Sequence, residues 1–171
     1  MIPTYSFYTY KPIRYKASHS ENDIRNFIYK FKDGERDAIE AAARIISNKI
    51  GSRYNSVFVC IPASSSVMNN KRYEYFSYLV CKSTGMLNGF RHIKVNGTKK
   101  ALHNTTKGNV DRGDYSLNID DKFFFGKNVI VFDDIITRGY SMMNFSKKLS
   151  DLGANVIGGL FLAHTYNPFD N

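Results

Sequence analysis

Two adjacent carboxylates, Asp133 and Asp134, follow a run of four apolar residues at positions 129–132. Such a run is typical of a strand that is buried on both faces. Because burying two neighbouring carboxylates would cost several kcal/mol for each one, we expect both at the carboxyl end of this strand, where the chain leaves the core. Open α/β sheets bind their ligands at that end. The two acids are therefore the first candidates for ligand chemistry.

The segment after the acids combines hydroxyl groups, a cation and a glycine. Its residues are Thr137, Arg138, Gly139, Tyr140 and Ser141. An amphipathic stretch follows, so the segment reads as a loop entering a helix amino terminus, where free N–H groups and the positive end of the dipole favour a phosphate monoester. The carboxylates can accept hydrogen bonds from a vicinal diol such as ribose, or help to organise a hydrated Mg²⁺. Together these features predict a site for ribose 5-phosphate.

Residues 129–141 resemble, position by position, the phosphoribosyl-pyrophosphate (PRPP) motif of type I phosphoribosyltransferases: four apolar residues, two acids, two aliphatic residues and a Thr-x-Gly-x-Ser cup. An alternative is a buried strand whose Asp-Asp pair caps a helix, which explains neither the cup nor the paired acids. Arg138 stands where many members have Thr or Ser, and this extra cation either tightens phosphate binding or points to solvent. The resemblance implies an α/β, type I phosphoribosyltransferase-like fold, with a central, mostly parallel sheet flanked by helices and a small hood.

The activity that this resemblance implies is Mg²⁺-dependent transfer of ribose 5-phosphate from PRPP to a nitrogenous-base acceptor, with release of pyrophosphate. It makes Asp133 and Asp134 the catalytic, ribose-binding acids and residues 137–141 the 5-phosphate site. Mg²⁺ would be carried by PRPP, assisted by the two acids, without a direct protein site. The family also implies a homodimer. The rival hypothesis is a non-catalytic regulator that senses PRPP or a nucleotide and binds nucleic acid or a protein partner.

A second buried strand, expected at 57–62, ends in a loop of small residues: Ala63, Ser64, Ser65 and Ser66. No Gly-x-Ser-x-Gly elbow surrounds these serines, so nucleophilic catalysis is not indicated. Small residues let backbone N–H groups approach an anion, and the resemblance assigns the loop to pyrophosphate, with a plain strand-to-helix turn as the alternative. Lys71 and Arg72 stand at the start of the next expected helix, where the positive end of the helix dipole disfavours cations. They are therefore either pyrophosphate ligands or part of a solvated face.

Within the family, the order of elements is most similar to the ComF branch, the amidophosphoribosyltransferase-like proteins linked to DNA uptake. That order is a strand, a Pro-containing loop, a basic-aromatic helix start, a long loop and the PRPP motif, over residues 25–163. Residues 71–75 read Lys-Arg-Tyr-Glu-Tyr where the branch usually has Arg-Gly-Phe-Asn-Gln. The branch assignment therefore depends on the order of elements and not on that run.

Both chain ends and one internal segment are expected outside the core. Residues 1–18 are rich in Tyr and read as an edge strand or, by their interleaved cations, as a surface that stacks on bases. By the resemblance, 1–18 and 164–171 form the hood that receives the acceptor. The polar composition of 96–121 predicts a flexible loop, in which Lys99 and Lys100 are the candidates for contact with the leaving pyrophosphate.

Hydrophobic periodicity predicts the scaffold around these segments. Helices are expected at 20–31, 35–50 and 69–84, and further strands at 90–95 and 155–163. Alternating strands and helices of this length predict a parallel sheet that is covered on both faces.

Composition limits the class of protein. The chain of 171 residues is expected to form a single domain, 1–171, with its own core. No apolar run reaches the ~18 residues of a membrane helix, and the amino terminus has no apolar signal region, so we expect a soluble, cytoplasmic protein without a membrane partner. The net charge of +9 fits a polyanion such as PRPP and equally a nucleic acid, which we favour less. Cys60 and Cys81 lack the spacing of a disulfide or zinc framework.

Overall fold

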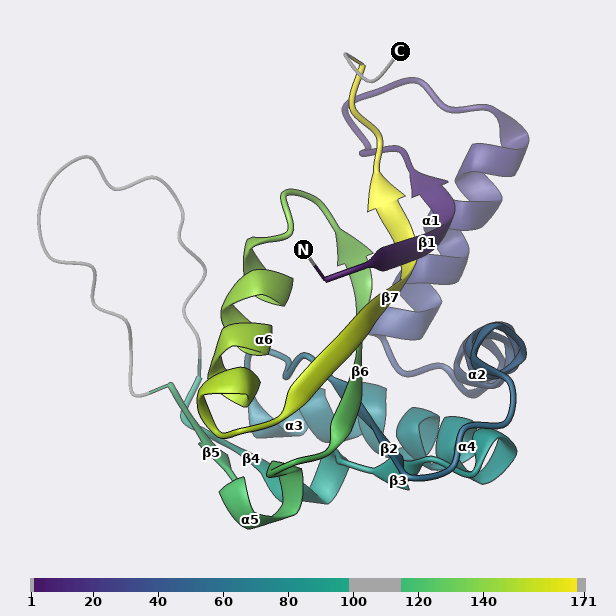
Figure 1. The fold of residues 1–171 in the computed structure, drawn as a ribbon. Helices are drawn as coiled ribbons and strands as arrows, with labels where there is room; N and C mark the ends of the chain where they lie inside the picture. The colour runs from purple at the N-terminus through teal and green to yellow at the C-terminus, as the bar shows by residue number, and fades with distance from the viewer. Residues whose placement is uncertain (1, 99–114, 169–171) are drawn as a thin grey trace, which may run out of the picture.

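A five-stranded parallel sheet in the order β1-β7-β6-β2-β3 lies at the centre of the structure, a computed structural model that describes residues 2–98 and 115–168 (Figure 1). Its strands are β1 (Thr4–Tyr10), β2 (Ser56–Cys60), β3 (Leu87–Asn88), β6 (Asn128–Ile136) and β7 (Asn155–Thr165). Because all neighbouring strands run in the same direction, their carboxyl ends meet at one edge. The predicted α/β fold with a mostly parallel central sheet is confirmed.

Helices cover both faces of this sheet (Figure 1). One face carries α1 (His19–Lys32), α2 (Arg36–Ile50) and a continuous helical segment made of α3 (Ser66–Asn69), the π-helical turn η1 (Asn70–Glu74) and α4 (Tyr75–Thr84). The other face carries α5 (Asp121–Phe124), α6 (Tyr140–Asp151) and an antiparallel pair, β4 (Ile93–Asn96) and β5 (Ser116–Ile119), with the 3₁₀ turn η2 (Phe90–His92) before β4. Each long helix turns an apolar stripe to the sheet, as its hydrophobic period predicts.

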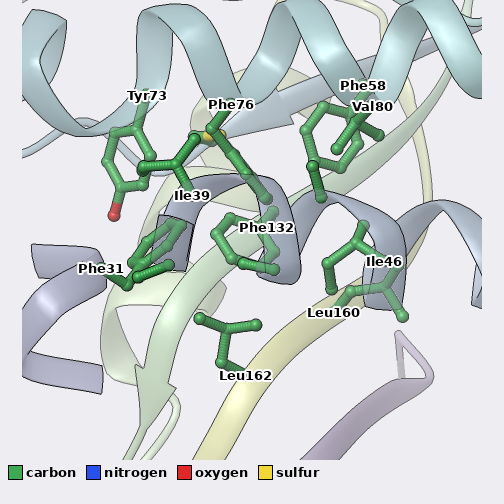
Figure 2. Close-up of a cluster of buried hydrophobic side chains, with 14 of the residues drawn as sticks. Phe31, Ile39, Ile46, Phe58, Tyr73, Phe76, Val80, Phe132, Leu160 and Leu162 are labelled. Atoms are coloured by element: carbon green, nitrogen blue, oxygen red, sulfur yellow. The ribbon is translucent and has the colours of Figure 1, made fainter. Parts of the chain in front are cut away.

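Phe132 of β6 lies at the centre of the core on the α1, α2 and α4 side (Figure 2). Its ring centroid is 4.6 Å from that of Phe76, and both rings are buried. Val131, the preceding residue, packs instead in the cluster beneath α6. Because side chains alternate along a strand, this packing also assigns the next two residues to opposite faces. Asp133 shares the face of Val131, and Asp134 shares the face of Phe132.

The amino-terminal stretch forms an edge strand, β1, which pairs with β7, so the edge-strand interpretation is confirmed. Arg25 of α1 holds the turn that follows β1. Its guanidinium donates hydrogen bonds to three carbonyl oxygens, those of Lys11, Pro12 and Tyr15. The Tyr15 ring packs edge-on against Tyr166, with 5.5 Å between centroids. The described parts of the two expected hood segments, 1–18 and 164–171, therefore meet at the carboxyl edge of the sheet.

The prediction of a loop over 96–121 is wrong for its carboxyl-terminal part, which forms β5 opposite β4. Leu117 and Ile119 alternate with polar residues in β5 and pack against the cluster beneath α6. A period of two over only four residues is too short a signal to separate a strand from a polar loop. The flexible-loop candidates Lys99 and Lys100 lie outside the described residues.

Both cysteines, Cys60 and Cys81, are free thiols buried in the core on the α2 and α4 side. Burial raises the pKa of both thiols, to about 12 for Cys81, so they stay protonated and pack as small apolar side chains. No helix within residues 2–98 and 115–168 is long and apolar enough to cross a bilayer.

Gly34 sets the distance between the α1–α2 turn and the helical segment that contains η1. Its φ of +70° is left-handed, and a Cβ at this position would lie 2.7 Å from the carbonyl oxygen of Lys71. Gly126 has the same φ of +70°, but no atom outside its chain neighbours lies within 4 Å of its Cβ position. A side chain at Gly126 would therefore cost only backbone strain, whereas a side chain at Gly34 would cost backbone strain and a steric clash.

We expect Gly126→Ala to lower the free energy of unfolding by about 1 kcal/mol, the cost of a left-handed conformation for a residue with a Cβ. Gly34→Ala should lower it by about 2 kcal/mol or more, because the Lys71 backbone must also move. Urea denaturation followed by circular dichroism measures both losses. Equal losses would mean that Gly34 is needed only for its dihedral angles.

Candidate functional site

The loop between β6 and α6 encloses a cavity of about 250 Å³ at the carboxyl edge of the sheet. We call this space the loop cavity. It is lined by Asp133, Ile135, Ile136, Thr137, Arg138, Gly139, Tyr140, Ser141, Met142 and Phe161. The loop is tied to the neighbouring strand, because the hydroxyls of Thr137 and Thr165 lie 2.7 Å apart. All five residues of the predicted cup therefore surround one space, with the first acid among its walls.

The amide groups of this loop are open to a ligand. Gly139, at φ +73°, precedes the first helical residue of α6, and the first hydrogen bond of the helix runs from Met143 N to Gly139 O at 2.9 Å. Amides in the first turn of a helix have no acceptor within the helix. In the part of the chain that the structure describes, residues 138–142 donate no backbone hydrogen bond outside helices and strands. An anion in the loop cavity would meet these donors at the positive end of the helix dipole.

A second cavity, of about 580 Å³, adjoins the first and lies among α6, η1, β5 and the segment after β2. We call it the α6 cavity. Asp133, Tyr140 and Ser141 line both cavities, so the two spaces meet at these residues. The α6 cavity adds Asn144 and Lys148 from the next turns of α6. A ligand anchored in the loop cavity can therefore extend past Asp133 into a larger polar space.

Asp133 is the acid that both cavities share. Its Oδ1 accepts hydrogen bonds from the Tyr73 hydroxyl at 3.2 Å and from the Asp134 amide at 2.9 Å. Burial raises the pKa of this carboxyl to about 7, and the charge of Asp134 adds to the increase, whereas the two hydrogen bonds and Lys32 oppose it. Its Oδ2 has no hydrogen-bond partner among the described residues. This oxygen is available to a ligand.

Asp134 faces the other side of the sheet and is only 5% exposed. Its Oδ2 lies 3.1 Å from Arg72 Nη1, and its Oδ1 lies 3.7 Å from Lys32 Nζ. The expectation that both acids stand where the strand leaves the core is wrong, because β6 continues to Ile136. The cost of burying Asp134 is offset by two cations, one from α1 and one from η1. One acid therefore faces the cavities, and the other is held inside by ion pairs.

The expected position of Lys71 and Arg72 at a helix start is also wrong, because the helical segment begins at Ser66 and both residues lie in η1. Arg72 is engaged by Asp134, and its Nε donates to a main-chain carbonyl of α1 at 3.2 Å, while its side chain also borders the α6 cavity. Lys71 lines neither cavity. A π-helical turn inside an α-helix is often found at functional sites, and here it carries the cation that reaches Asp134.

Of the four small residues assigned to pyrophosphate, Ala63 lines the α6 cavity and the three serines do not. The Ala63 amide donates to Asn69 Oδ1 at 3.0 Å, and its carbonyl accepts from the Tyr115 hydroxyl at 3.3 Å. Ser65 caps α3, since its hydroxyl accepts a hydrogen bond from a main-chain amide in that helix. The structure brings Ala63 to the site and leaves the serines at its margin.

Sequence reasoning missed three residues of the site: Tyr73, Asn144 and Lys148. The buried Tyr73 supports Asp133; burial and the two nearby carboxylates raise its pKa well above the usual value, so its hydroxyl keeps the proton that it donates. The position of Tyr73 directly after Arg72 in the sequence was the feature that could have indicated its role. Tyr140, Asn144 and Lys148 follow each other at intervals of four on α6, which puts them on one helix face. That spacing would have predicted the lining of the α6 cavity.

Metal binding depends on the same acid. Within the described residues no group of three or more His, Cys, Asp or Glu side chains could hold a metal ion. Asp133 is the one carboxylate among the described residues that lines the loop cavity or the α6 cavity. Mg²⁺ commonly binds through one or two carboxylates together with phosphate oxygens of a substrate. The residues present therefore fit a Mg²⁺ ion that a phosphorylated ligand brings, and not one held by the protein alone.

Comparison with known proteins gives similarity at the level of solved structures. No protein-family model and no curated protein sequence matches the chain. It is similar to an adenine phosphoribosyltransferase from Thermoanaerobacter pseudethanolicus, with 17% identity, coverage of 76% of this chain and 70% of that chain, and a TM-score of 0.48. It is also similar to a purine phosphoribosyltransferase from Pyrococcus horikoshii, with 11% identity, 96% and 95% coverage and a TM-score of 0.37. A hypothetical protein from Neisseria gonorrhoeae with bound ppGpp has 14% identity, 98% and 74% coverage and a TM-score of 0.38. Because these similarities are weak, the assignment of a function depends on the residues of the site.

Replacing Arg72 with Met removes the closer cation from buried Asp134 and keeps most of the aliphatic stem. We expect Arg72→Met to lower the free energy of unfolding at pH 7 by about 3 kcal/mol or more. Adding Asp134→Asn should restore part of this loss, because it removes a buried charge that only Lys32 then faces. Urea denaturation measures both changes.

Arg36→Met is the matched control, because Arg36 pairs with Glu40 at 3.0 Å on the surface with 78% of its side chain exposed. Its loss should stay below about 1 kcal/mol. If Arg72→Met lowers the free energy of unfolding no more than Arg36→Met does, the buried Arg72–Asp134 pair is not important for stability.

Asp133 should make the protein less stable as the pH rises. Its pKa is raised from 3.8 to about 7 in the folded state, so between these values the folded chain holds a proton that the unfolded chain has released. The free energy of unfolding then falls with increasing pH by up to about 1.4 kcal/mol per pH unit. Asp133→Asn removes this titration, so urea denaturation should find the variant gaining stability relative to the unchanged protein from pH 4 to pH 8. A difference that does not vary with pH would mean that the pKa of Asp133 is not raised.

Proposed function

We propose that the chain binds PRPP along the carboxyl edge of its sheet and transfers ribose 5-phosphate to a base-like acceptor, with release of pyrophosphate. The observation that carries the proposal is an open amide loop beside a carboxylate that faces the same cavity. A phosphate monoester fits the free N–H groups of residues 138–142, and a vicinal diol fits Oδ2 of Asp133. Ribose 5-phosphate carries both groups on one small molecule.

In this proposal the loop binds the 5-phosphate through its amides and through the hydroxyls of Thr137 and Ser141, with Arg138 as an added cation. Asp133 accepts hydrogen bonds from the ribose hydroxyls. Asp134 acts on the ligand indirectly, since its ion pairs with Arg72 and Lys32 fix the position of β6 behind the site. A diol donates best to an ionised carboxylate, so bound PRPP should lower the pKa of Asp133.

The pyrophosphate group would extend into the α6 cavity, where Asn144 and Lys148 are the polar side chains that α6 adds. Departure of pyrophosphate builds positive charge on C1 of the sugar, and the Asp133 carboxylate, held by Tyr73, is oriented to stabilise that charge without accepting a proton. Mg²⁺ bound to the phosphate oxygens would neutralise charge on the leaving group. Lys99 and Lys100, which lie outside the described residues, remain candidates for the same task.

One observation favours a second candidate function. Arg72 is already occupied by Asp134, and Ser64, Ser65 and Ser66 do not line the site, so the described residues offer few groups to a leaving pyrophosphate. This arrangement suits a protein that binds PRPP or a nucleotide without turning it over and passes the signal to nucleic acid or to a protein partner. A homodimer is compatible with either function.

A carboxylate introduced into the loop cavity should repel the 5-phosphate. Ser141 lines both cavities, whereas Met143, two residues later on α6, is 59% exposed and lines neither. We expect Ser141→Asp to weaken PRPP binding at least tenfold in isothermal titration calorimetry with Mg²⁺, and Met143→Asp to leave the affinity within about twofold. Equal affinities of the two variants for PRPP would show that the loop is not part of the binding site.

Pyrophosphate release distinguishes the enzyme from the sensor. Incubation with PRPP, Mg²⁺ and a panel of nucleobases should release pyrophosphate with at least one base, and Asp133→Asn should lower the rate at least a hundredfold by removing the charge beside C1. Binding of PRPP with no release for any base would support the sensor instead.

A further inference from the structure

A third cavity, of about 350 Å³, lies at the opposite, amino-terminal edge of the sheet, on the face that α2 covers. We call it the amino-edge cavity. It is bounded by the first residues of β1, the last turn of α2 and the beginning of β7. Its volume is within the range of small-molecule sites. It shares no lining residue with the loop cavity or the α6 cavity, so it is a separate feature of the molecule.

Gly158 creates the space in this cavity. A Cβ at Gly158 would have only the carbonyl oxygen of Pro3 within 4 Å, at 3.6 Å, an ordinary contact. The next glycine, Gly159, differs, because its Cβ would lie 2.7 Å from the side chain of Met142 in α6. β7 also carries a bulge here, because Ile157 is an extra residue relative to β6. The missing side chain of Gly158 therefore opens toward the cavity and not toward packed core.

The cavity combines an apolar floor with two cations. The floor consists of Ile50, Ile130, Ile157 and Leu160. Lys49, in the last turn of α2, and Arg53, in the loop after it, line the same space, and no Asp or Glu of the described chain does. Neither cation has an ion-pair partner among the described residues. Lys49 Nζ instead lies 3.7 Å from the ring centroid of Tyr5, which is 45% exposed.

A structural role explains only part of this arrangement. Lys49 complements the carbonyl end of α2, where a cation is favourable. Arg53 lies beyond that helix, and a helix cap requires no cavity beside it. The carbonyl end of α2 also disfavours an anion, so any attraction of the cavity for an anion must come from Lys49 and Arg53 together.

We propose that the amino-edge cavity binds a small amphiphilic anion, an apolar body that carries one carboxylate or phosphate group. The body would lie on the apolar floor above Gly158, and its anionic group would bind Lys49 and Arg53. An uncharged molecule of the same shape lacks the second interaction, and a bare inorganic anion lacks the first. This site is independent of PRPP binding.

Titration of the ¹⁵N-labelled full chain with 1-naphthoate tests the proposal, with 1-naphthamide as the uncharged probe of the same shape. We expect saturable shifts of the Tyr5 and Gly159 amide signals with a Kd of about 1 mM or lower. The affinity should be at least tenfold weaker for 1-naphthamide, and at least tenfold weaker for 1-naphthoate in the Lys49→Gln/Arg53→Gln variant. Arg44→Gln is the control, because Arg44 is an exposed cation of α2 that does not line the cavity.

Gly158→Val provides an independent test, because it fills the cavity with a side chain that suits a strand. It should abolish the 1-naphthoate shifts and leave PRPP binding unchanged. Equal affinity for the two probes, or an unchanged affinity in the Lys49→Gln/Arg53→Gln variant, would overturn the proposal. Shifts that persist in a folded Gly158→Val protein would do the same. If circular dichroism shows that Gly158→Val is unfolded, the comparison of the two probes and the Lys49→Gln/Arg53→Gln variant still decide whether the proposal holds.

Discussion

The alternation of side chains along β6 is the constraint on which the rest of the site depends. Phe132 commits one face of the strand to the core under α1, α2 and α4, and the acids that follow are separated by the sheet itself. Asp134 is carried inside and needs Arg72 and Lys32 to offset its burial. Asp133 is left on the cavity side with a raised pKa and with one oxygen that has no hydrogen-bond partner among the described residues. The same pair of adjacent residues thus supplies one acid that is ion-paired inside the protein and one that faces the cavities.

The two helical layers contribute differently to this arrangement. The layer on the α1 and α4 side holds the acids from behind, through Lys32, Arg72 and the Tyr73 hydroxyl. The layer on the α6 side supplies the first-turn amides of α6 and one wall of the α6 cavity. The site lies where the two layers meet at the end of β6. A change in either layer should therefore alter the environment of the Asp133 carboxyl.

The end of β7 connects the loop between β6 and α6 to the segments expected to form a hood. Thr165 contacts the hydroxyl of Thr137 in the loop, and the next residue, Tyr166, packs against Tyr15. Arg25 holds the turn that contains Tyr15 through main-chain carbonyls. An acceptor bound beneath this turn would therefore lie near the loop, so residues at the two chain ends would contribute to the choice of acceptor.

Much of this architecture could be predicted from residue patterns. Apolar runs and helical periods located the buried strands and the long helices, and the order of hydroxyls, cation and glycine after Asp133 located the loop that encloses a cavity. The division of labour between the acids could not be predicted, because it depends on Arg72, which is distant in sequence and reaches Asp134 from a π-helical turn. Four-residue β5 was missed, since its pattern is too short. The sequence also left the role of Ser65 open, because a helix cap and an anion loop favour the same small polar residues.

In the proposed complex the amides of residues 138–142 enclose a phosphoryl group, and Asp133 accepts hydrogen bonds from the hydroxyls of the attached sugar. A titration of the ¹⁵N-labelled chain with ribose 5-phosphate tests this arrangement, with ribose alone and inorganic phosphate as references. We expect saturable shifts concentrated on residues 138–142, strongest for the intact ligand and weakened when Asp133 is replaced by Asn. Shifts spread over the basic surface, or none at the loop, would contradict it.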